Sequence, residues 1–289
     1  MAQTFTEFSE SAKSNQPHYL VIGHPIDHSL SPLMHNKALT YHNIDAKYHA
    51  VNLRPDELTS FISWVNRDQF LGCNITIPYK QQLFEIVDDL DENAARAGAI
   101  NTISKTHANI LVGSNTDIFG FTNPLLPYSS EIEDMRAIVF GTGGASKAVH
   151  IALEELGVAE IIYVSRNPSG EIDNVNGTFT KSVGYDQWQA FTDDATLIVN
   201  TTPLGMGNFS NKSIIDDSDI DLLAKKICYD LIYNPLETKF LKQAKSAGAE
   251  VISGLEMFIQ QGRKSFQTWT NKNFPVDEIR SLLREELQS

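Results

Sequence analysis

Two ionisable side chains, Lys80 and Asp117, could act together in proton transfer although 37 residues separate them. They stand in "CNITIPYK" and "GSNTDIFG", where an apolar run gives way to small polar residues and then to proline or glycine. The stretch "YLVIGHPIDHSLSP" has the same design and carries Ser29 and Ser31. Because the carboxyl ends of strands form the binding crevice of an open α/β sheet, we expect these side chains to converge there, with their neighbours Asn74, Thr76, Asn115 and Thr116. A lysine and an aspartate in one crevice stabilise each other's charge and can share proton transfer.

The same residues also fit ordinary structural roles. Ser31 precedes Pro32 and suits a helix N-cap that is followed by proline at the first helical position. Thr76 could simply end a strand, and Asp117 could cap a helix. Lys80 could be a solvated charge in a first helical turn, where a cation is least favoured. The residue types alone leave both interpretations open.

Three histidines, His24, His28 and His35, lie within twelve residues and raise the alternative of a metal site. The prolines between them break any single helical face that would align the rings. Asp27 is the only acidic residue among them and no cysteine joins them, so the usual ligand set is incomplete. We therefore expect no metal, and we expect the histidines to serve turns and packing.

A glycine-rich turn, "VFGTGGASKAV", lies between a predicted buried strand and a predicted helix. A dinucleotide-binding fold needs glycine here, both for the tight turn and for the close approach of backbone to pyrophosphate. Backbone N–H groups at the helix N-terminus then face the phosphate. A tight strand–helix turn is the alternative, and Ser146 replaces the third glycine of the fingerprint. The surrounding strands and helix favour a cofactor loop formed by Gly141, Gly143, Gly144 and Ala145.

The next strand ends in "EIIYVSRNP", which indicates the type of cofactor. An NAD site usually carries an acidic residue here, and this chain has Ser165 and Arg166 instead. The planar guanidinium of Arg166 suits a 2′-phosphate, so we expect NADP, with a solvated surface arginine as the alternative. In "VNTTPLGMG" a further strand ends at Thr201, Thr202 and Pro203, where the nicotinamide ring or the phosphates could pass.

Strand-like and helix-like segments alternate along the chain, which predicts two α/β domains with mostly parallel sheets and a cleft between them. In the first series we expect strands at 19–23, 48–53 and 70–77, helices at 55–65 and 78–90, and a hairpin from 99–104 and 108–115. In the second series we expect strands at 136–141, 160–165, 196–200, 226–233 and 249–253, and helices at 145–157, 237–248 and 254–270. The last helix is expected to return to the first domain.

The bulk properties exclude several classes of protein. The chain has 289 residues, enough for two domains, and a net charge of −13, which argues against nucleic-acid or membrane partners. Cys73 and Cys228 sit in separate apolar runs and fit buried thiols in a reducing, cytoplasmic compartment. The first sixteen residues lack a signal-peptide pattern, and we assign them no element and no role. No apolar run approaches the roughly 20 residues of a membrane span.

The motifs taken together resemble the shikimate dehydrogenase family, which includes shikimate/quinate dehydrogenases. The resemblance runs from Gly23 to about Trp269 as an ordered series of nine motifs: "HPIDHSLSPLMHN", "GCNITIPYK", "AGAINTI", "GSNTDIFG", "GTGGASKAV", "SRN", "NTTPLGMG", "DLIYNPLETKFLKQAKSAGA" and "GLEMFIQQ". It implies reversible, NADPH-dependent reduction of 3-dehydroshikimate to shikimate in aromatic amino-acid and chorismate biosynthesis. It also implies a substrate-binding catalytic domain over 1–121 and 253–289 and a Rossmann domain over 122–252.

The resemblance also implies roles for individual residues. Lys80 would be the acid/base for the reacting hydroxyl, and Asp117 would orient it. The substrate would be bound by Ser29 and Ser31, which hold its carboxylate, and by Thr76, Asn101, Tyr233 and Gln261, with Gln260 as an alternative to Gln261. The cofactor would be bound by the glycine loop, by Ser165, Arg166, Thr201, Thr202 and Pro203, and by Gly254.

The cofactor loop departs from the family pattern, which commonly reads N-R-T with a second basic residue soon after. Here it reads "SRNPSGEID". One alternative is therefore a quinate/shikimate dehydrogenase with relaxed use of NAD and NADP, although Ser31, where quinate-using relatives often carry threonine, favours shikimate. A non-catalytic module that binds small carboxylates is a second alternative, and a non-redox transferase or lyase is a third. The resemblance is compatible with a monomer or a homodimer.

Overall fold

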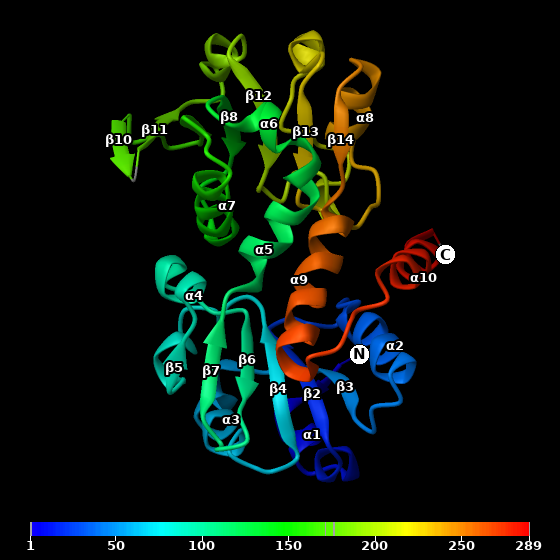
Figure 1. Ribbon diagram of the computed structural model, residues 1–289. Coiled ribbons are helices and arrows are strands. Elements are labelled where there is room, and N and C mark those ends of the chain that lie inside the picture. The colour runs from blue at the N-terminus through cyan, green and yellow to red at the C-terminus, as the bar shows by residue number, and fades with distance from the viewer. Residues whose placement is uncertain (1, 171, 176, 289) are drawn as a thin grey trace. The chain divides into compact units, whose positions relative to one another are not determined.

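The computed structural model describes residues 2–170, 172–175 and 177–288 (Figure 1). It divides the chain into two compact units, a first unit of residues 2–117 with 261–288 and a second unit of residues 118–260. Both units are α/β, as the alternation of strands and helices predicts. Within the described residues no helix is both long and apolar enough to cross a membrane.

The first unit is built on a seven-stranded sheet in the order β1-β3-β2-β4-β6-β7-β5. Four of its neighbouring pairs are parallel, and β6 is antiparallel to both β4 and β7, which gives the expected hairpin. The strands are β1 Gln3–Thr4, β2 His18–Gly23, β3 Lys47–Asn52, β4 Phe70–Ile75, β5 Asp89–Leu90, β6 Thr102–Lys105 and β7 Leu111–Ser114. Every residue of β2 is buried, as expected for a central parallel strand.

Short helices complete the first unit. The α-helices are α1 Phe5–Ser9, α2 Ser31–Tyr41, α3 Leu58–Trp64, α4 Glu92–Ala97 and α10 Val276–Gln288, and the 3₁₀ turns are η1 Ala12–Asn15, η2 Pro55–Glu57 and η3 Phe84–Ile86. Helix α10 packs on α2, where Lys37 lies 3.3 Å from Glu278. The core contains Leu20, Phe61 and Phe70, which are fully buried.

One predicted helix of the first unit does not form, and the elements near the N-terminus were not predicted. The segment expected as a helix at 78–90 forms turns, η3 and the short strand β5, because its backbone bonds to other segments: Ile100 N–H donates to the Lys80 carbonyl at 2.9 Å. Residues 2–16, for which the sequence predicted no element, are structured. Strand β1 extends the sheet beside β3, and α1 buries Phe5 and Phe8 in the core. Their polar composition hides two phenylalanines three residues apart, which share one helical face.

The second unit holds a seven-stranded sheet in the order β10-β11-β9-β8-β12-β13-β14. All of its pairs are parallel except β10 with β11. Counted from β8 without the edge strand β10, the order is 3-2-1-4-5-6, the Rossmann arrangement. The strands are β8 Arg136–Phe140, β9 Glu160–Val164, β10 Ile172–Val175, β11 Thr178–Val183, β12 Ala195–Asn200, β13 Ile227–Asp230 and β14 Glu250–Ile252. Sequence reasoning missed β10 and β11.

Along the chain, helices and 3₁₀ turns precede and connect the strands of the second sheet. They are α6 Ser129–Ile132, α7 Gly144–Glu155 and α8 Lys239–Ser246, with 3₁₀ turns η4 Asn123–Tyr128, η5 Trp188–Phe191, η6 Gly207–Phe209 and η7 Asp217–Leu223. Two helices, α5 Thr116–Thr122 and α9 Gly254–Thr270, contribute residues to both units. The free thiols of Cys73 and Cys228 are buried, one in each unit, and burial raises the pKa of both, that of Cys228 to about 12.

Candidate active site

Lys80 and Asp117 lie together in the first unit, as the strand-end pattern suggested. The Lys80 ammonium donates to Asp117 Oδ2 over 2.5 Å, and the two side chains are 32% and 16% exposed. Lys80 lies in the turn that follows β4, held through its carbonyl by Ile100 N–H. Asp117 lies in the first turn of α5, where its own N–H donates to the Asn115 side chain at 3.1 Å. The pair is therefore reachable by a ligand and fixed at both backbones.

Asn101 holds the second oxygen of Asp117. Its side-chain amide donates to Asp117 Oδ1 at 2.8 Å and to Thr116 Oγ1 at 3.0 Å. The side-chain oxygen Oδ1 of Asn101 accepts the Thr116 backbone N–H at 2.8 Å, which fixes the orientation of the side-chain amide. Asn101 is 3% exposed, so this arrangement is shielded from competing water. Each carboxylate oxygen of Asp117 thus has its own donor.

A buried chain of hydroxyls and amides continues from Asn101 into the first unit. Thr102 and Thr116 lie beside Asn101, and both contact the hydroxyl of Ser265 on α9. Asn74 donates to Ser265 at 2.9 Å and accepts from the Tyr48 hydroxyl at 2.7 Å. Sequence reasoning missed Tyr48, Thr102 and Ser265. Of these three, Thr102 could have been found from the sequence, because it directly follows the predicted site residue Asn101 in "AINTIS".

The two serines lie at the start of α2. The alternative role of Ser31 as an N-cap is wrong: Leu30 is the N-cap residue, its side chain makes no capping hydrogen bond, and Ser31 is the first residue of the helix. The Ser29 hydroxyl accepts the Ser31 N–H at 3.3 Å. The Ser31 side chain lies near the Tyr48 phenol and opposes the rise in the pKa of Tyr48. Burial raises the pKa of Tyr48 far above its ordinary value, so this phenol stays neutral. Ser31 therefore lies beside Tyr48, which belongs to the same buried chain as Asn101.

Thr76 follows β4 and packs against Gly23 at the end of β2. A Cβ on Gly23 would come within 2.4 Å of Thr76 Cγ2, so this close approach requires glycine. The Thr76 N–H donates to the Ile22 carbonyl at 2.9 Å, and its side chain is half-buried. Thr76 thus lies at the carboxyl edge of the sheet, as the serines do.

The histidines do not assemble. His24 is exposed and its Nδ1 lies 2.8 Å from the Asn52 side chain, while His28 is exposed. His35 is buried and stacks on Tyr48 with ring centroids 4.4 Å apart and an interplanar angle of 9°, and burial lowers its pKa to about 3. Across residues 2–170, 172–175 and 177–288, no three His, Cys, Asp or Glu side chains group as a metal ion would need.

The glycine loop of the second unit has the geometry of a phosphate cradle. Gly141 has φ +104°, and a Cβ there would lie 2.6 Å from Thr201 Oγ1. Gly143 and Gly144 face open space, since a Cβ on either would meet no atom within 4 Å. Ser146, in the third fingerprint position, donates from its hydroxyl to the Gly143 carbonyl at 2.6 Å. Residues 142–145 are exposed and form the start of α7, whose first two residues are Gly144 and Ala145, so this turn fits a dinucleotide pyrophosphate.

Two further strand ends border this loop. Ser165 follows β9, and its hydroxyl accepts the Asn167 N–H at 3.2 Å. Arg166 is exposed, and its charge opposes the rise that burial causes in the pKa of Tyr185. After β12, the Thr201 hydroxyl donates to the Phe140 carbonyl at 2.8 Å, which ties the loop "NTTPLGMG" to the end of β8. The order of strands reverses between β8 and β12, where Rossmann folds bind ligands.

A buried carboxyl fixes the loops after β12 and β13. Asp230 accepts from the Asn200 amide at 3.0 Å, the Ile232 N–H at 3.1 Å and the Thr238 hydroxyl at 2.6 Å. Burial raises its pKa to about 6 despite these donors. Asn200 also accepts from the hydroxyl and the N–H of Thr202 at 2.7 and 2.9 Å, so Thr202 and the adjoining Pro203 are held indirectly by Asp230.

The remaining predicted residues lie on or near α9. A Cβ on Gly254 would lie 2.2 Å from the Leu231 carbonyl oxygen, so only glycine fits at this position without a shift of the backbone. Tyr233 stacks on Phe258 with centroids 4.7 Å apart. Gln260 is 6% exposed and belongs to the second unit, whereas Gln261 is half-buried and belongs to the first, where its carbonyl accepts from Ser265.

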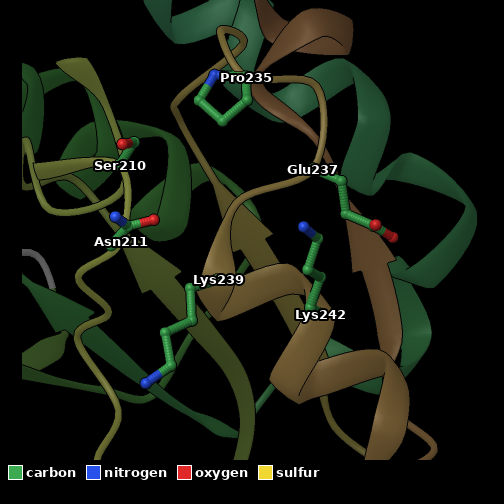
Figure 2. Close-up of a pocket in the computed structure, with 6 residues that line it drawn as sticks. All are labelled: Ser210, Asn211, Pro235, Glu237, Lys239 and Lys242. Atoms are coloured by element: carbon green, nitrogen blue, oxygen red, sulfur yellow. The ribbon is translucent and has the colours of Figure 1, made fainter.

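A separate cavity of about 340 Å³ lies in the second unit (Figure 2). Its side chains come from the segment after η6, from the loop after β13 and from the first turn of α8: Ser210, Asn211, Pro235, Glu237, Lys239 and Lys242. Lys239 is already paired with Asp217 at 2.9 Å. None of the predicted catalytic, substrate or cofactor residues lines this cavity.

A Rossmann unit with an open glycine cradle, joined to an α/β unit that presents a Lys–Asp pair, defines a two-domain, dinucleotide-dependent oxidoreductase. A family model for the shikimate dehydrogenase substrate binding domain matches residues 21–103, and one for the shikimate 5'-dehydrogenase C-terminal domain matches residues 254–284. A relative from Maridesulfovibrio salexigens, named shikimate dehydrogenase (NADP(+)), is 38% identical over 271 residues, 92% of this chain and 96% of the relative. The chain belongs to the shikimate dehydrogenase family.

Solved structures agree with this assignment. Shikimate 5-dehydrogenase from Listeria monocytogenes, in complex with shikimate and NAD, has a TM-score of 0.83 at 27% identity and covers 93% of this chain and 96% of its own. The enzyme from Thermus thermophilus, in complex with NADP(H) and shikimate, has a TM-score of 0.78 at 30% identity and covers 93% and 99%.

Proposed function

We propose that this protein catalyses the reversible, NADP-dependent reduction of 3-dehydroshikimate to shikimate. The observation that carries the proposal is the Lys80–Asp117 pair at 2.5 Å, with Asn101 on the other carboxylate oxygen. Ketone reduction needs a proton donor at the oxygen that becomes a hydroxyl, and a partly exposed ammonium held by a carboxylate can serve. The curated relative from M. salexigens carries the corresponding name.

Each residue then has a stated role. The bound nicotinamide cofactor supplies or accepts the hydride. In the reducing direction Lys80 gives a proton from Nζ to the ketone oxygen, and in the oxidising direction it takes the hydroxyl proton back. Asp117 keeps Nζ in place and compensates its charge, and Asn101 keeps Asp117 in place. The proposed substrate-binding residues are Ser29, Ser31, Thr76, Asn101, Tyr233 and Gln261.

The serines suit a carboxylate ligand. A neutral hydroxyl can donate to a carboxylate oxygen, and the hydroxyl proton of Ser31 can rotate toward such a ligand. Two hydroxyls can bind the substrate carboxylate without a cationic pocket, which agrees with the acidic composition of the chain. We propose that residues 1–121 and 253–289 form the substrate domain and that residues 122–252 form the cofactor domain.

The cofactor is proposed to bind along the carboxyl edge of the second sheet. Gly141, Gly143, Gly144 and Ala145 would receive the pyrophosphate, and Ser165 and Arg166 the 2′-phosphate. Thr201, Thr202, Pro203 and Gly254 would border the nicotinamide half. NADP is favoured by the exposed guanidinium of Arg166 and by the names of the curated relatives. We also propose that the enzyme works in the cytoplasm as a monomer or homodimer.

Turnover can be followed by the absorbance of the reduced nicotinamide, with shikimate and quinate each paired with NADP⁺ and NAD⁺. We expect shikimate with NADP⁺ to be preferred, and comparable turnover of quinate with NAD⁺ would instead indicate relaxed specificity. Lys80→Ala should lower kcat by about 10²- to 10⁴-fold with a smaller effect on KM. Absence of turnover with every pairing would refute the function, and an unchanged kcat in Lys80→Ala would refute the role of Lys80.

A further inference from the structure

Ser265 is a fully buried polar residue on α9, and it belongs to none of the motifs from which the active site was predicted. Its hydroxyl lies 2.9 Å from Asn74 Nδ2, 2.9 Å from Thr102 Oγ1, 3.1 Å from Thr116 Oγ1 and 3.1 Å from the Gln261 carbonyl. A hydroxyl has one proton and two lone pairs, so these four contacts cannot all be equal. Which of them donate and which accept follows from the neighbours.

Two assignments satisfy these groups, and they differ only in which threonine donates to Ser265. The Gln261 carbonyl can only accept, so Ser265 donates to it, and the Asn74 amide can only donate, so Ser265 accepts from it. The second lone pair of Ser265 then accepts one hydroxyl proton, from Thr102 at 2.9 Å or from Thr116 at 3.1 Å. The other threonine donates to Asn101 Oδ1, which lies 3.1 Å from each hydroxyl. Thr116 Oγ1 also accepts from the Asn101 amide, and Thr102 Oγ1 accepts from Asn74.

Both assignments connect Ser265 with the catalytic pair. Without the Ser265 oxygen, the hydroxyls of Thr102 and Thr116 would both turn to Asn101 Oδ1, which is 3.1 Å from each. That oxygen also accepts the Thr116 N–H, so one of three donors would be left without a lone pair. Because the same amide donates to Asp117 Oδ1, its displacement would displace Asp117 relative to Lys80.

We propose that Ser265 is a positioning residue that fixes Asp117 and Lys80 through Thr116 and Asn101. The inference rests on the proposed function, since it assigns Ser265 to the proton-transfer array of that reaction. Ser265 also donates to the carbonyl of Gln261 and, through Asn74, is connected to Tyr48, the phenol beside Ser31.

A matched control lies in the same helix. The Thr268 hydroxyl also donates to the carbonyl four residues earlier, that of Lys264, at 3.0 Å, but Thr268 is exposed. Removal of the hydroxyl by Thr268→Ala therefore tests the helix-internal bond alone. Ser265→Cys nearly preserves the side-chain volume but replaces the hydroxyl with a much weaker donor and acceptor, so it separates hydrogen bonding from packing.

The experiment measures kcat and KM for shikimate with NADP⁺ in the full-length protein and in Ser265→Ala, Ser265→Cys and Thr268→Ala. We expect both Ser265 variants to lose kcat by about 10- to 100-fold with KM changed by less than about threefold, because misplacement of a catalytic group affects the chemical step. Thr268→Ala should match the unchanged protein. In a Thr116→Val background, Ser265→Ala should add less than about a twofold further loss.

The two possible failures are distinguishable. If the unchanged protein shows no turnover, both the proposed function and this inference are refuted. If it turns over and Ser265→Ala or Ser265→Cys keeps kcat within about twofold, the inference alone fails. A loss confined to KM, or fully multiplicative losses in the double variant, would also refute positioning through Thr116.

Discussion

The most informative single change is Asn101→Asp, which keeps the shape of the side chain and replaces its donating amide by a carboxyl. The amide nitrogen now lies 2.8 Å from Asp117 Oδ1. An ionised oxygen in its place would repel Asp117 by about 6 kcal/mol at an effective dielectric constant of about 20. By the same measure, the attraction between Lys80 and Asp117 at 2.5 Å is about 7 kcal/mol. The new charge would therefore nearly cancel the effect of the lysine on Asp117.

The size of the effect on rate follows from that repulsion. If less than half of it, about 2.7 kcal/mol, opposes the transition state, kcat falls by about 100-fold. The new carboxyl is buried beside a second carboxylate, and both conditions raise its pKa. Once protonated, it donates an O–H to Asp117 Oδ1 as the amide does. The defect should therefore be large at pH 9 and should shrink as the pH is lowered toward 6.

The assay compares kcat of Asn101→Asp, Asn101→Ala and the unchanged protein at each pH. We expect the ratio of unchanged protein to Asn101→Asp to decrease on acidification, while the ratio to Asn101→Ala stays constant because alanine cannot regain a donor. Circular dichroism at each pH confirms that the variants are folded. A pH-independent ratio for Asn101→Asp, or a kcat equal to that of the unchanged protein, would refute the role assigned to the Asn101 amide.

Two further predictions concern packing and pH. Gly254→Ala should lower Tm by several degrees, at a cost of about 1–3 kcal/mol or more, because its Cβ would lie 2.2 Å from the Leu231 carbonyl oxygen. The control is Gly143→Ala, where φ is −81° and no atom lies within 4 Å of the new Cβ; it should leave Tm unchanged and raise KM for NADP⁺. Equal shifts of Tm in the two variants would contradict this prediction. Burial lowers the pKa of His35 to about 3, so the unfolded chain takes up this proton near pH 6.5 and the folded protein only near pH 3. The contribution of neutral His35 to stability is complete above pH 6.5 and declines below it, by about 2 kcal/mol at pH 5. In urea unfolding, His35→Phe should therefore lose less stability between pH 7.5 and pH 5 than the unchanged protein does. An equal loss in both proteins would contradict this prediction.

The convergence of Lys80 and Asp117 could be predicted from sequence because it depends on one rule, that the carboxyl ends of neighbouring strands meet at one edge of a sheet. The glycine loop could be predicted for a similar reason, since the strand, the turn and the helix are contiguous. Both predictions use local patterns and a general topology. Neither requires knowledge of which side chains are buried.

Ser265 and Tyr48 could not be predicted in this way. In "GRKSFQTWT" the serine stands among polar residues and looks like part of a solvated helix face. Its burial depends on Asn74, Thr102 and Thr116, which come from three other segments of the chain. The helix expected at 78–90 failed for a related reason: its backbone partners, such as Ile100 and Leu111, lie on later segments, and they outcompete a local helix.

The two buried thiols have a practical consequence for spectroscopy. Cys73 and Cys228 are fully buried and both have raised pKa values, so neither presents a reactive thiolate to a maleimide dye at neutral pH. A cysteine introduced at an exposed position, such as Thr268→Cys in the first unit or Lys242→Cys in the second, would be the preferred target of the dye. The native chain is thus a ready host for a donor–acceptor dye pair, one on each unit, with no native cysteine removed. Energy transfer between the dyes would then report the spacing of the two units as shikimate and NADP⁺ are added.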